Sequence, residues 1–216
     1  MKRKLLIIPG GGDPASPLYK KGFDLVKEEA LKRGFESVEI LKFPGHLSYS
    51  DEELFLNQEI ASKILIDYLK ILEKKGLHYT IFGRSYGCGV ILRALSNLNL
   101  YKLESIKLWG PVPILGLYQV ILGLPENILI AKEKGCNLNI ESFNSCIPFE
   151  IQLFKYNNTI PLKIGIGSLD KYSKPSFYNF LEEYIPIKEN VSYTILEGLE
   201  HEVLEKNEGY FNFIFN

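Results

Sequence analysis

The chain has 216 residues, of which 46% are hydrophobic, so it can form one domain with a sizeable core and is too apolar for general disorder. Its 25 Lys and Arg residues are balanced by 26 Asp and Glu residues, which excludes a large basic face and disfavours a nucleic-acid partner. The 3 cysteines and 3 histidines share no close spacing, which disfavours a disulfide framework or a zinc site. The cysteine content favours the reducing cytoplasm, and we expect no metal and no cofactor.

The N-terminal segment imitates the start of a secretory signal. Basic residues at 2–4 precede an apolar run at 5–8, which Pro9 and the glycines after it end. Such a run is too short to direct export or to span a membrane, so we expect no stable membrane insertion. Residues 4–8 instead have the composition of a strand that is buried on both faces.

Helix signals follow this strand. Residues 16–34 begin with a Ser-Pro pair, typical of a helix N-cap and first turn, and end with a glycine. A second strand is predicted over residues 37–43. The sequence Ser50-Asp51-Glu52-Glu53 has the pattern of a capping box, and it predicts the start of a long helix that reaches Gly76.

The alternation of strand and helix continues to the end of the chain. Further strands are predicted at residues 79–82, 105–109, 161–167 and 191–197, each with helix-type sequence after it. This order predicts an α/β fold with a mostly parallel sheet of about six strands, covered by helices on both faces. No internal repeat, low-complexity tract or linker divides the chain, so we expect residues 1–216 to form a single domain.

The segment Gly83-Arg84-Ser85-Tyr86-Gly87 joins the strand at 79–82 to the next helix. A G-x-S-x-G pattern arises easily by chance, and in a simpler interpretation Ser85 only caps the helix. The place of the motif is more specific, because a strained strand-to-helix turn lifts a serine above the carboxyl edge of a sheet. Glycines at 83 and 87 then make room where side chains would collide with neighbouring backbone.

A nucleophilic serine needs a base and a group that orients the base. After Ser85 the chain has a single aspartate, Asp170, and a single histidine, His201, and each directly follows a predicted strand. Because the carboxyl ends of parallel strands meet at one edge of a sheet, we expect the three residues to lie together. Either residue alone has a simpler explanation, as a helix cap or as an ordinary surface or core histidine. Their order along the chain predicts a Ser-Asp-His catalytic triad.

These motifs resemble those of the α/β-hydrolase superfamily over nearly the whole chain. The resemblance assigns the nucleophile elbow to residues 83–87, the acid to Asp170 and the base to His201. It also puts Pro9–Asp13 in the place of the oxyanion loop. The chain is expected to lack the usual N-terminal hairpin of this fold, and it has Arg84 where many members have a histidine.

The glycine loop after the first strand has a second interpretation. The pattern Gly10-x-Gly12-x-x-Ala15 matches part of a dinucleotide-binding fingerprint, in which backbone N–H groups hold a pyrophosphate. That fingerprint requires an acidic residue at the end of the second strand, where this chain has Leu41-Lys42-Phe43-Pro44. We therefore favour an oxyanion hole, whose donors are the N–H of Tyr86 and one N–H from Gly11, Gly12 or Asp13.

The connection between the strands at 105–109 and 161–167 is longer than one crossover helix requires. Its apolar residues come in clusters separated by glycine and proline, as in several short helices. Part of the connection is expected to pack on the sheet, and the resemblance implies a lid or cap at about 112–157 over Ser85. The apolar composition favours an uncharged acyl or aryl group over a sugar or a phosphate.

Two residues near these motifs receive minor assignments. His46 follows the second strand, and we expect a solvated loop histidine rather than a residue of the pocket. Cys88 lies one helical turn past Ser85 and is expected to be a small buried packing residue.

The sequence thus predicts a serine hydrolase that cleaves a carboxylic ester or thioester of a small, apolar acyl group. Ser85 attacks the acyl carbonyl, His201 transfers the proton to the leaving group, and Asp170 orients and stabilises the imidazole. Acyl transfer uses the same machinery and stays open. A non-catalytic binding protein of this fold is the alternative from another class, against which the intact Ser, Asp and His argue. The partner is a small molecule in either case, and the sequence leaves the oligomeric state undetermined.

Overall fold

A computed structural model of the chain describes residues 3–49, 54–96, 98–176, 178–179 and 188–216. Its centre is one sheet with the strand order β2-β1-β3-β4-β5-β6, in which every neighbouring pair is parallel. The strands are β1 (Arg3–Ile8), β2 (Ser37–Ile40), β3 (His78–Arg84), β4 (Leu103–Trp109), β5 (Leu162–Gly167) and β6 (Val191–Leu196). The predicted six-stranded parallel sheet is confirmed for the described residues.

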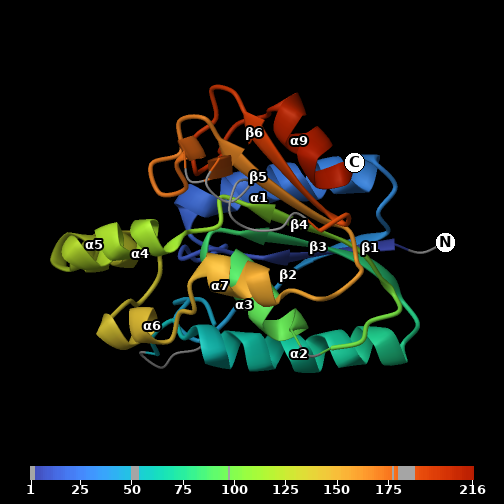
Figure 1. Cartoon of the computed structure of the whole chain (residues 1–216), viewed down its shortest axis with the longest axis horizontal. Helices are drawn as coiled ribbons and strands as arrows, with labels where there is room; N and C mark the ends of the chain where they lie inside the picture. Colours follow the sequence, from blue (N-terminus) through green and yellow to red (C-terminus); the bar gives the residue numbers. More distant parts are fainter. Residues whose placement is uncertain (1–2, 50–53, 97, 177, 180–187) are drawn as a thin grey trace.

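Helices cover both faces of this sheet (Figure 1). One face carries α1 (Pro17–Lys32) and α9 (Glu208–Phe215), and the other carries α2 (Gln58–Lys74), α3 (Tyr86–Leu95) and α7 (Phe149–Lys155). Successive strand residues point to opposite faces, so β1 contributes Leu5 and Ile7 to the core under α1 and Leu6 and Ile8 to the core under α2. The strand β1 is therefore apolar on both sides, as a central strand of a sheet covered on both faces requires.

The ends of some elements differ from the sequence prediction. The helix α2 begins at Gln58, where the Asn57 side chain accepts a hydrogen bond from the Ile60 N–H. The capping box predicted at Ser50–Glu53 lies outside the described residues, and the N-cap of this helix is Asn57 instead. Ser16 does precede α1, but its side chain makes no capping hydrogen bond. The strand β2 ends at Ile40, so the predicted strand over 37–43 is too long.

Four helices form the connection between β4 and β5. The first three are α4 (Ile114–Leu122), α5 (Leu124–Glu133) and α6 (Ile140–Asn144), and they lie beyond the end of the sheet that is remote from the N terminus (Figure 1). The fourth, α7, packs on α3, and its Phe149 and Leu153 belong to the buried core. This division makes α7 the crossover helix and places α4 to α6 at the carboxyl edge of the strands. None of the described helices is long and apolar enough to cross a membrane.

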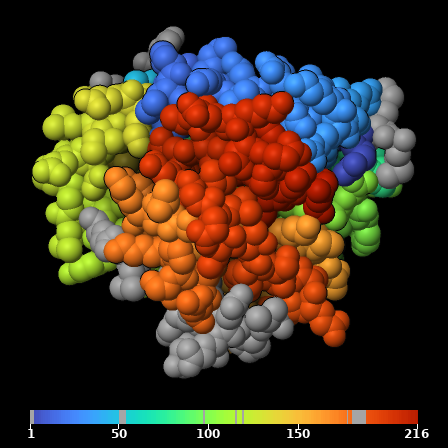
Figure 2. Space-filling model, turned by 90° about the horizontal axis from the view of Figure 1, so that it is seen from above, coloured from blue at the N-terminus to red at the C-terminus, as the bar shows by residue number. Residues whose placement is uncertain are grey.

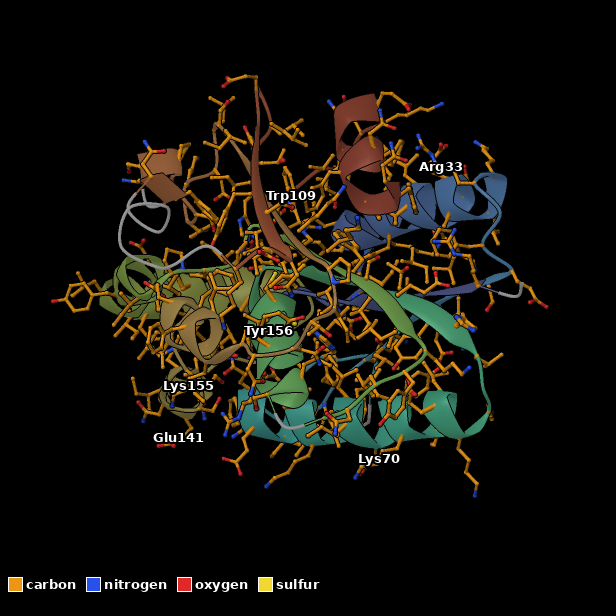
Figure 3. The ribbon with its side chains drawn as sticks, turned by 45° about the vertical axis from the view of Figure 1, so that its right-hand side comes forward. Arg33, Lys70, Trp109, Glu141, Lys155 and Tyr156 are labelled. Atoms are coloured by element: carbon orange, nitrogen blue, oxygen red, sulfur yellow. The ribbon has the colours of Figure 1, made fainter. Side chains whose placement is uncertain are left out.

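Trp109, the last residue of β4, connects the sheet to the C-terminal part of the chain. Its ring has no exposed surface and packs against Tyr210 and Phe213 at centroid distances of 4.9 and 5.6 Å. Figure 3 shows Trp109 inside the molecule, whereas Lys70 lies on the outside. The indole N–H donates a hydrogen bond to the carbonyl of His201 at 3.0 Å. A buried side chain of β4 therefore holds the backbone at His201.

Candidate active site

Ser85 stands at the sharp turn between β3 and α3. Its φ of 51° is the only positive φ of a non-glycine residue in the described part of the chain, and such a conformation costs about 1–3 kcal/mol. The Ser85 N–H donates to the carbonyl of Trp109, and the Ser85 carbonyl accepts from the N–H of Cys88, both at 2.9 Å. These two bonds hold the strained turn in place. Cys88 itself is fully buried, as predicted.

Both glycines of the turn lie in close packing, but only Gly87 meets backbone. A Cβ at Gly87 would lie 2.4 Å from the carbonyl oxygen of Ile8, which is backbone and cannot give way easily. A Cβ at Gly83 would lie 2.3 Å from Cδ1 of Ile91, the end of a side chain. The expected collision with backbone therefore applies to Gly87, whereas Gly83 makes room for a core side chain.

Asp170 and His201 are hydrogen-bonded to each other in the loops after β5 and β6. The distance between His201 Nδ1 and Asp170 Oδ2 is 2.8 Å, and Asp170 Oδ1 accepts the N–H groups of Tyr172 and Ser173 at 2.8 Å each. Burial acts to raise the pKa of Asp170, but the hydrogen bond and charge of His201 and the two backbone N–H groups outweigh it and lower the pKa. An ionised Asp170 can only accept a hydrogen bond, so Nδ1 of the neutral imidazole carries the proton. Nε2 is then left as the base.

Two residues that the sequence analysis did not single out confine this pair. Gly110 has a φ of 56°, and a Cβ there would lie 2.9 Å from His201 Nδ1 and 3.1 Å from Asp170 Oδ2. The ring of Tyr172 packs edge-on against the imidazole with a centroid distance of 5.1 Å. Gly110 directly follows a predicted strand, and this position at the carboxyl edge of the sheet was the available sequence signal for its role. No sequence pattern pointed to Tyr172.

Ser85 and His201 line one cavity, together with the glycines of the loop after β1. No hydrogen bond joins the Ser85 hydroxyl to His201 within the described residues. Hydrogen bonds between catalytic groups are often longer without substrate than in the reacting complex. The structure thus places the three predicted triad residues at the same edge of the sheet, with the Asp170–His201 bond formed and the Ser85–His201 bond open.

The glycine loop after β1 lies directly against Ser85. A Cβ at Gly10 would lie 3.0 Å from Ser85 Cβ and 3.6 Å from Ser85 Oγ. A Cβ at Gly12 would lie 2.0 Å from the ring of Tyr19, whereas Gly11 has open space at that point. Gly12 is thus required for the packing of Tyr19, which is an explanation of the loop that needs no pyrophosphate.

The possible donors of the oxyanion hole are fewer than the sequence suggests. The N–H of Asp13 donates to the carbonyl of Lys134 at 2.9 Å, so the prediction that included Asp13 is wrong for this residue. Tyr86 is the first residue of α3, where an N–H has no partner within its own helix. Tyr86 and the two glycines Gly11 and Gly12 therefore stay as predicted donors.

His46 is buried rather than solvated, which corrects the prediction made for it. Only 2% of its surface is exposed, because the segment around Cys136 covers the loop and pairs with His46 in an isolated bridge. Its Nδ1 accepts the N–H of Phe43 at 3.0 Å, so its Nε2 carries the proton and faces the carbonyl of Gly10 at 3.3 Å. Burial lowers the pKa of His46. This neutral histidine supports the glycine loop from behind.

Two cavities meet at Ser85. The first, of about 130 Å³, is bordered by His201 and by the charged residues Arg84, Lys134 and Glu202. The second, of about 140 Å³, has mainly apolar walls, including Leu56, Leu117, Val120, Phe143, Ile147 and Phe149. Both cavities have many apolar wall residues, and charged side chains border the space next to Ser85 on the side of the first cavity only. Within the described ranges, no three or more His, Cys, Asp or Glu side chains are grouped so as to hold a metal ion.

Comparison with known proteins identifies the fold. No family model matches the chain, and no curated protein matches its sequence. Among solved structures, a monoacylglycerol lipase from Paleococcus ferrophilus is 17% identical, with a TM-score of 0.65 over 98% of this chain and 92% of the other. A serine hydrolase from Cycloclasticus zankles is 17% identical, with a TM-score of 0.63 over 99% and 89% of the two chains. An α/β-hydrolase from a Penicillium species is 15% identical, with a TM-score of 0.63 over 93% and 83%. Likeness at these identities concerns the fold alone, and it establishes that the chain has the α/β-hydrolase fold that its sequence motifs predict.

Proposed function

We propose that the protein is a serine hydrolase that cleaves a carboxylic ester or thioester with a small apolar acyl group. The observation that carries this proposal is the strained Ser85 beside a cavity that His201 also lines, with His201 hydrogen-bonded to a buried Asp170. Strain at a single non-glycine residue is retained where the surrounding structure holds a group for chemistry. A helix cap needs no such strain, and the Ser85 side chain makes no capping hydrogen bond.

The geometry supports a mechanism with an acyl-enzyme. Ser85 Oγ attacks the acyl carbon while His201 Nε2 takes the hydroxyl proton, and Asp170 stabilises the imidazolium that forms. The negative oxygen of the tetrahedral intermediate meets the N–H of Tyr86 and an N–H of the glycine loop. His201 then gives the proton to the leaving group, and water resolves the acyl-enzyme by the same route.

The two cavities divide the substrate between them. Because His201 lines only the first cavity, the leaving group that receives its proton lies on that side. The acyl group then occupies the second, apolar cavity, where Leu117 of α4 and Phe143 of α6 form part of the wall. In this proposal α4 to α6 act as the cap predicted within 112–157, and each methylene they bury contributes about 0.8 kcal/mol.

A fluorophosphonate probe tests the proposal directly. Because an activated serine attacks phosphorus as it attacks an acyl carbon, the native protein should be labelled stoichiometrically, with the adduct on Ser85 in peptide mapping. Ser85→Ala should abolish both labelling and the hydrolysis of p-nitrophenyl butanoate. Ser37→Ala is the matched control, because Ser37 is exposed on β2 and lines neither cavity. An unlabelled native protein, or an adduct on another residue, would favour the non-catalytic alternative.

A further inference from the structure

Arg84 is a buried cation in the wall of the first cavity. It precedes Ser85 in the chain, and only 5% of its surface is exposed. In the part of the chain that the structure describes, no acceptor is hydrogen-bonded to its guanidinium, which lies over the Tyr19 ring at 5.2 Å from the centroid. A buried charge without a hydrogen-bonded counter-ion costs several kcal/mol. The position of Arg84 therefore needs an explanation other than fold stability.

A second cation borders the same cavity from a distant part of the chain. Lys134, just after α5, donates to Glu202 Oε1 at 2.9 Å, and the same oxygen accepts the hydroxyl of Tyr19 at 2.5 Å. Figure 2 shows the yellow-green segment that contains α5 against both the blue N-terminal segment and the red C-terminal segment. Tyr19, Lys134 and Glu202, which line the same side of the cavity, thus come from regions that are far apart in the sequence.

Two cations, Arg84 and Lys134, and one anion, Glu202, are among the residues that line this cavity. Burial acts to raise the pKa of Glu202, but the hydrogen bonds of Tyr19 and Lys134 and the charges of Arg84 and Lys134 lower it, so Glu202 is ionised. Glu202 offsets the charge of Lys134, to which it is hydrogen-bonded. Arg84 is left without a hydrogen-bonded anion among the described residues, and its guanidinium lies beside the Tyr19 ring, which also lines this cavity.

We infer that the first cavity binds a carboxylate carried by the leaving group of the ester, an inference that rests on the proposed function. A guanidinium pairs with a planar carboxylate through two parallel hydrogen bonds, and Lys134 supplies a second cation nearby. The substrate class is therefore an O-acyl hydroxy acid or the corresponding thioester of a mercapto acid.

The reaction on such a substrate is balanced without a further reactant. The bond from Ser85 Oγ to the acyl carbon forms first, and the bond between the acyl carbon and the hydroxy-acid oxygen breaks when the tetrahedral intermediate collapses. The Ser85 proton passes through His201 to the departing oxygen, which releases a hydroxy acid with its carboxylate still ionised. Water then supplies the hydroxyl of the released carboxylic acid and restores the Ser85 hydroxyl.

A matched pair of esters tests the inference on the full chain. The two are 4-(butanoyloxy)benzoate and its methyl ester, which share the acyl group and the phenol ring and differ in the carboxylate. We expect kcat/KM of the anionic ester to exceed that of the neutral one about tenfold or more, the usual effect of hydrogen bonds to a charged group. Arg84→Gln and, separately, Lys134→Gln should each reduce this ratio several-fold. Lys132→Gln should not, because Lys132 is exposed in the last turn of α5 and borders neither cavity.

The outcomes separate this inference from the proposed function. Fluorophosphonate labelling of Ser85 in each variant shows whether its catalytic groups are intact, so Lys134→Gln still decides if Arg84→Gln fails to fold. Equal or faster cleavage of the neutral ester by the parent protein overturns the inference and leaves the proposed function standing. An equal loss of the ratio in Lys132→Gln also overturns it. Failure to cleave both esters, together with an unlabelled Ser85, contradicts the proposed function itself.

Discussion

Asp170→Asn is the perturbation whose effect the geometry defines most closely. Asp170 Oδ1 accepts two backbone N–H groups, those of Tyr172 and Ser173, and only an oxygen can take that place. The amide of the variant must therefore turn its NH₂ group toward His201 Nδ1, in the position that Oδ2 occupies at 2.8 Å. The imidazole then accepts at Nδ1 and carries its proton on Nε2. In that tautomer His201 cannot take the proton of Ser85.

The expected loss of turnover is large, whereas the fold should persist. A mis-set histidine tautomer costs about 10⁴ in kcat in a triad of this kind, which corresponds to about 5.4 kcal/mol in activation free energy. The backbone hydrogen bonds to the side-chain oxygen are retained, and the two side chains have nearly the same shape. We therefore expect the circular dichroism spectrum of the variant to match that of the parent.

The assay is kcat for p-nitrophenyl butanoate at saturating concentration, compared among the parent, Asp170→Asn and Glu200→Gln. Glu200 is an exposed carboxylate next to His201 in the chain, and its replacement should leave kcat within a factor of two, roughly the effect of a remote surface change. A value for Asp170→Asn within tenfold of the parent would refute the reasoning. It would show that Asp170 does not set the His201 tautomer during turnover.

Three further predictions concern the acyl cavity, a buried lysine and the glycine loop. Leu117→Asp should remove most of the preference for p-nitrophenyl butanoate over acetate in kcat/KM, about tenfold for two methylenes, whereas Ile121→Asp should not, because Ile121 is exposed and lines neither cavity. The same loss in both variants would contradict the proposed acyl cavity. Burial and the neighbouring Lys163 lower the pKa of Lys107 from 10.5 to about 8, so the unfolded chain binds more protons at this group between these values, and the contribution of Lys107 to stability should rise with pH there. In urea unfolding at pH 7.5 and 10, the free energy of unfolding of the parent relative to Lys107→Met should therefore increase by at most about 3 kcal/mol; an unchanged difference would refute it. Gly12→Ala should lower the free energy of unfolding by about 1–3 kcal/mol, since its Cβ would meet the Tyr19 ring at 2.0 Å, whereas Gly11→Ala, with open space, should cost less. A reversed order of the two alanine variants in urea unfolding would count against the observed packing of the loop.

Ile121 shows that helical spacing alone does not select the residues of the apolar cavity. Leu117 and Ile121 are four residues apart in α4, which places them on roughly the same face of the helix. Only Leu117 lines the apolar cavity, and Ile121 lies beyond its edge. Spacing along a helix shows which residues share a face. It does not show how far along that face the cavity extends, which depends on the segments packed beside the helix.

The fold class was predictable because its signals are local. A short apolar run such as β1, ended by proline and glycine, suits a strand that is buried on both faces, and a Ser-Pro pair marks the start of α1. The turn at Ser85 was also marked in the sequence by the glycines of the G-x-S-x-G motif. Gly87 must be a glycine because a side chain there would collide with the backbone of β1. From parallel strands it follows that residues after their carboxyl ends share one edge, which is why Ser85, Asp170 and His201 were expected to lie together.

What the tertiary structure decided is which of these residues are buried and which groups are already occupied. His46 was expected to be solvated, and the segment near Cys136 buries it; the N–H of Asp13 was a candidate donor, and the Lys134 carbonyl occupies it. Arg84 and Glu202 border one cavity with Lys134 although about 50 and 70 residues separate them from it in the chain. Periodicity and turn chemistry are properties of neighbouring residues, so the sequence by itself determined the elements and their order. Burial, hydrogen-bond partners and the charge of a cavity depend on contacts between remote segments, and these exist only once the chain has folded.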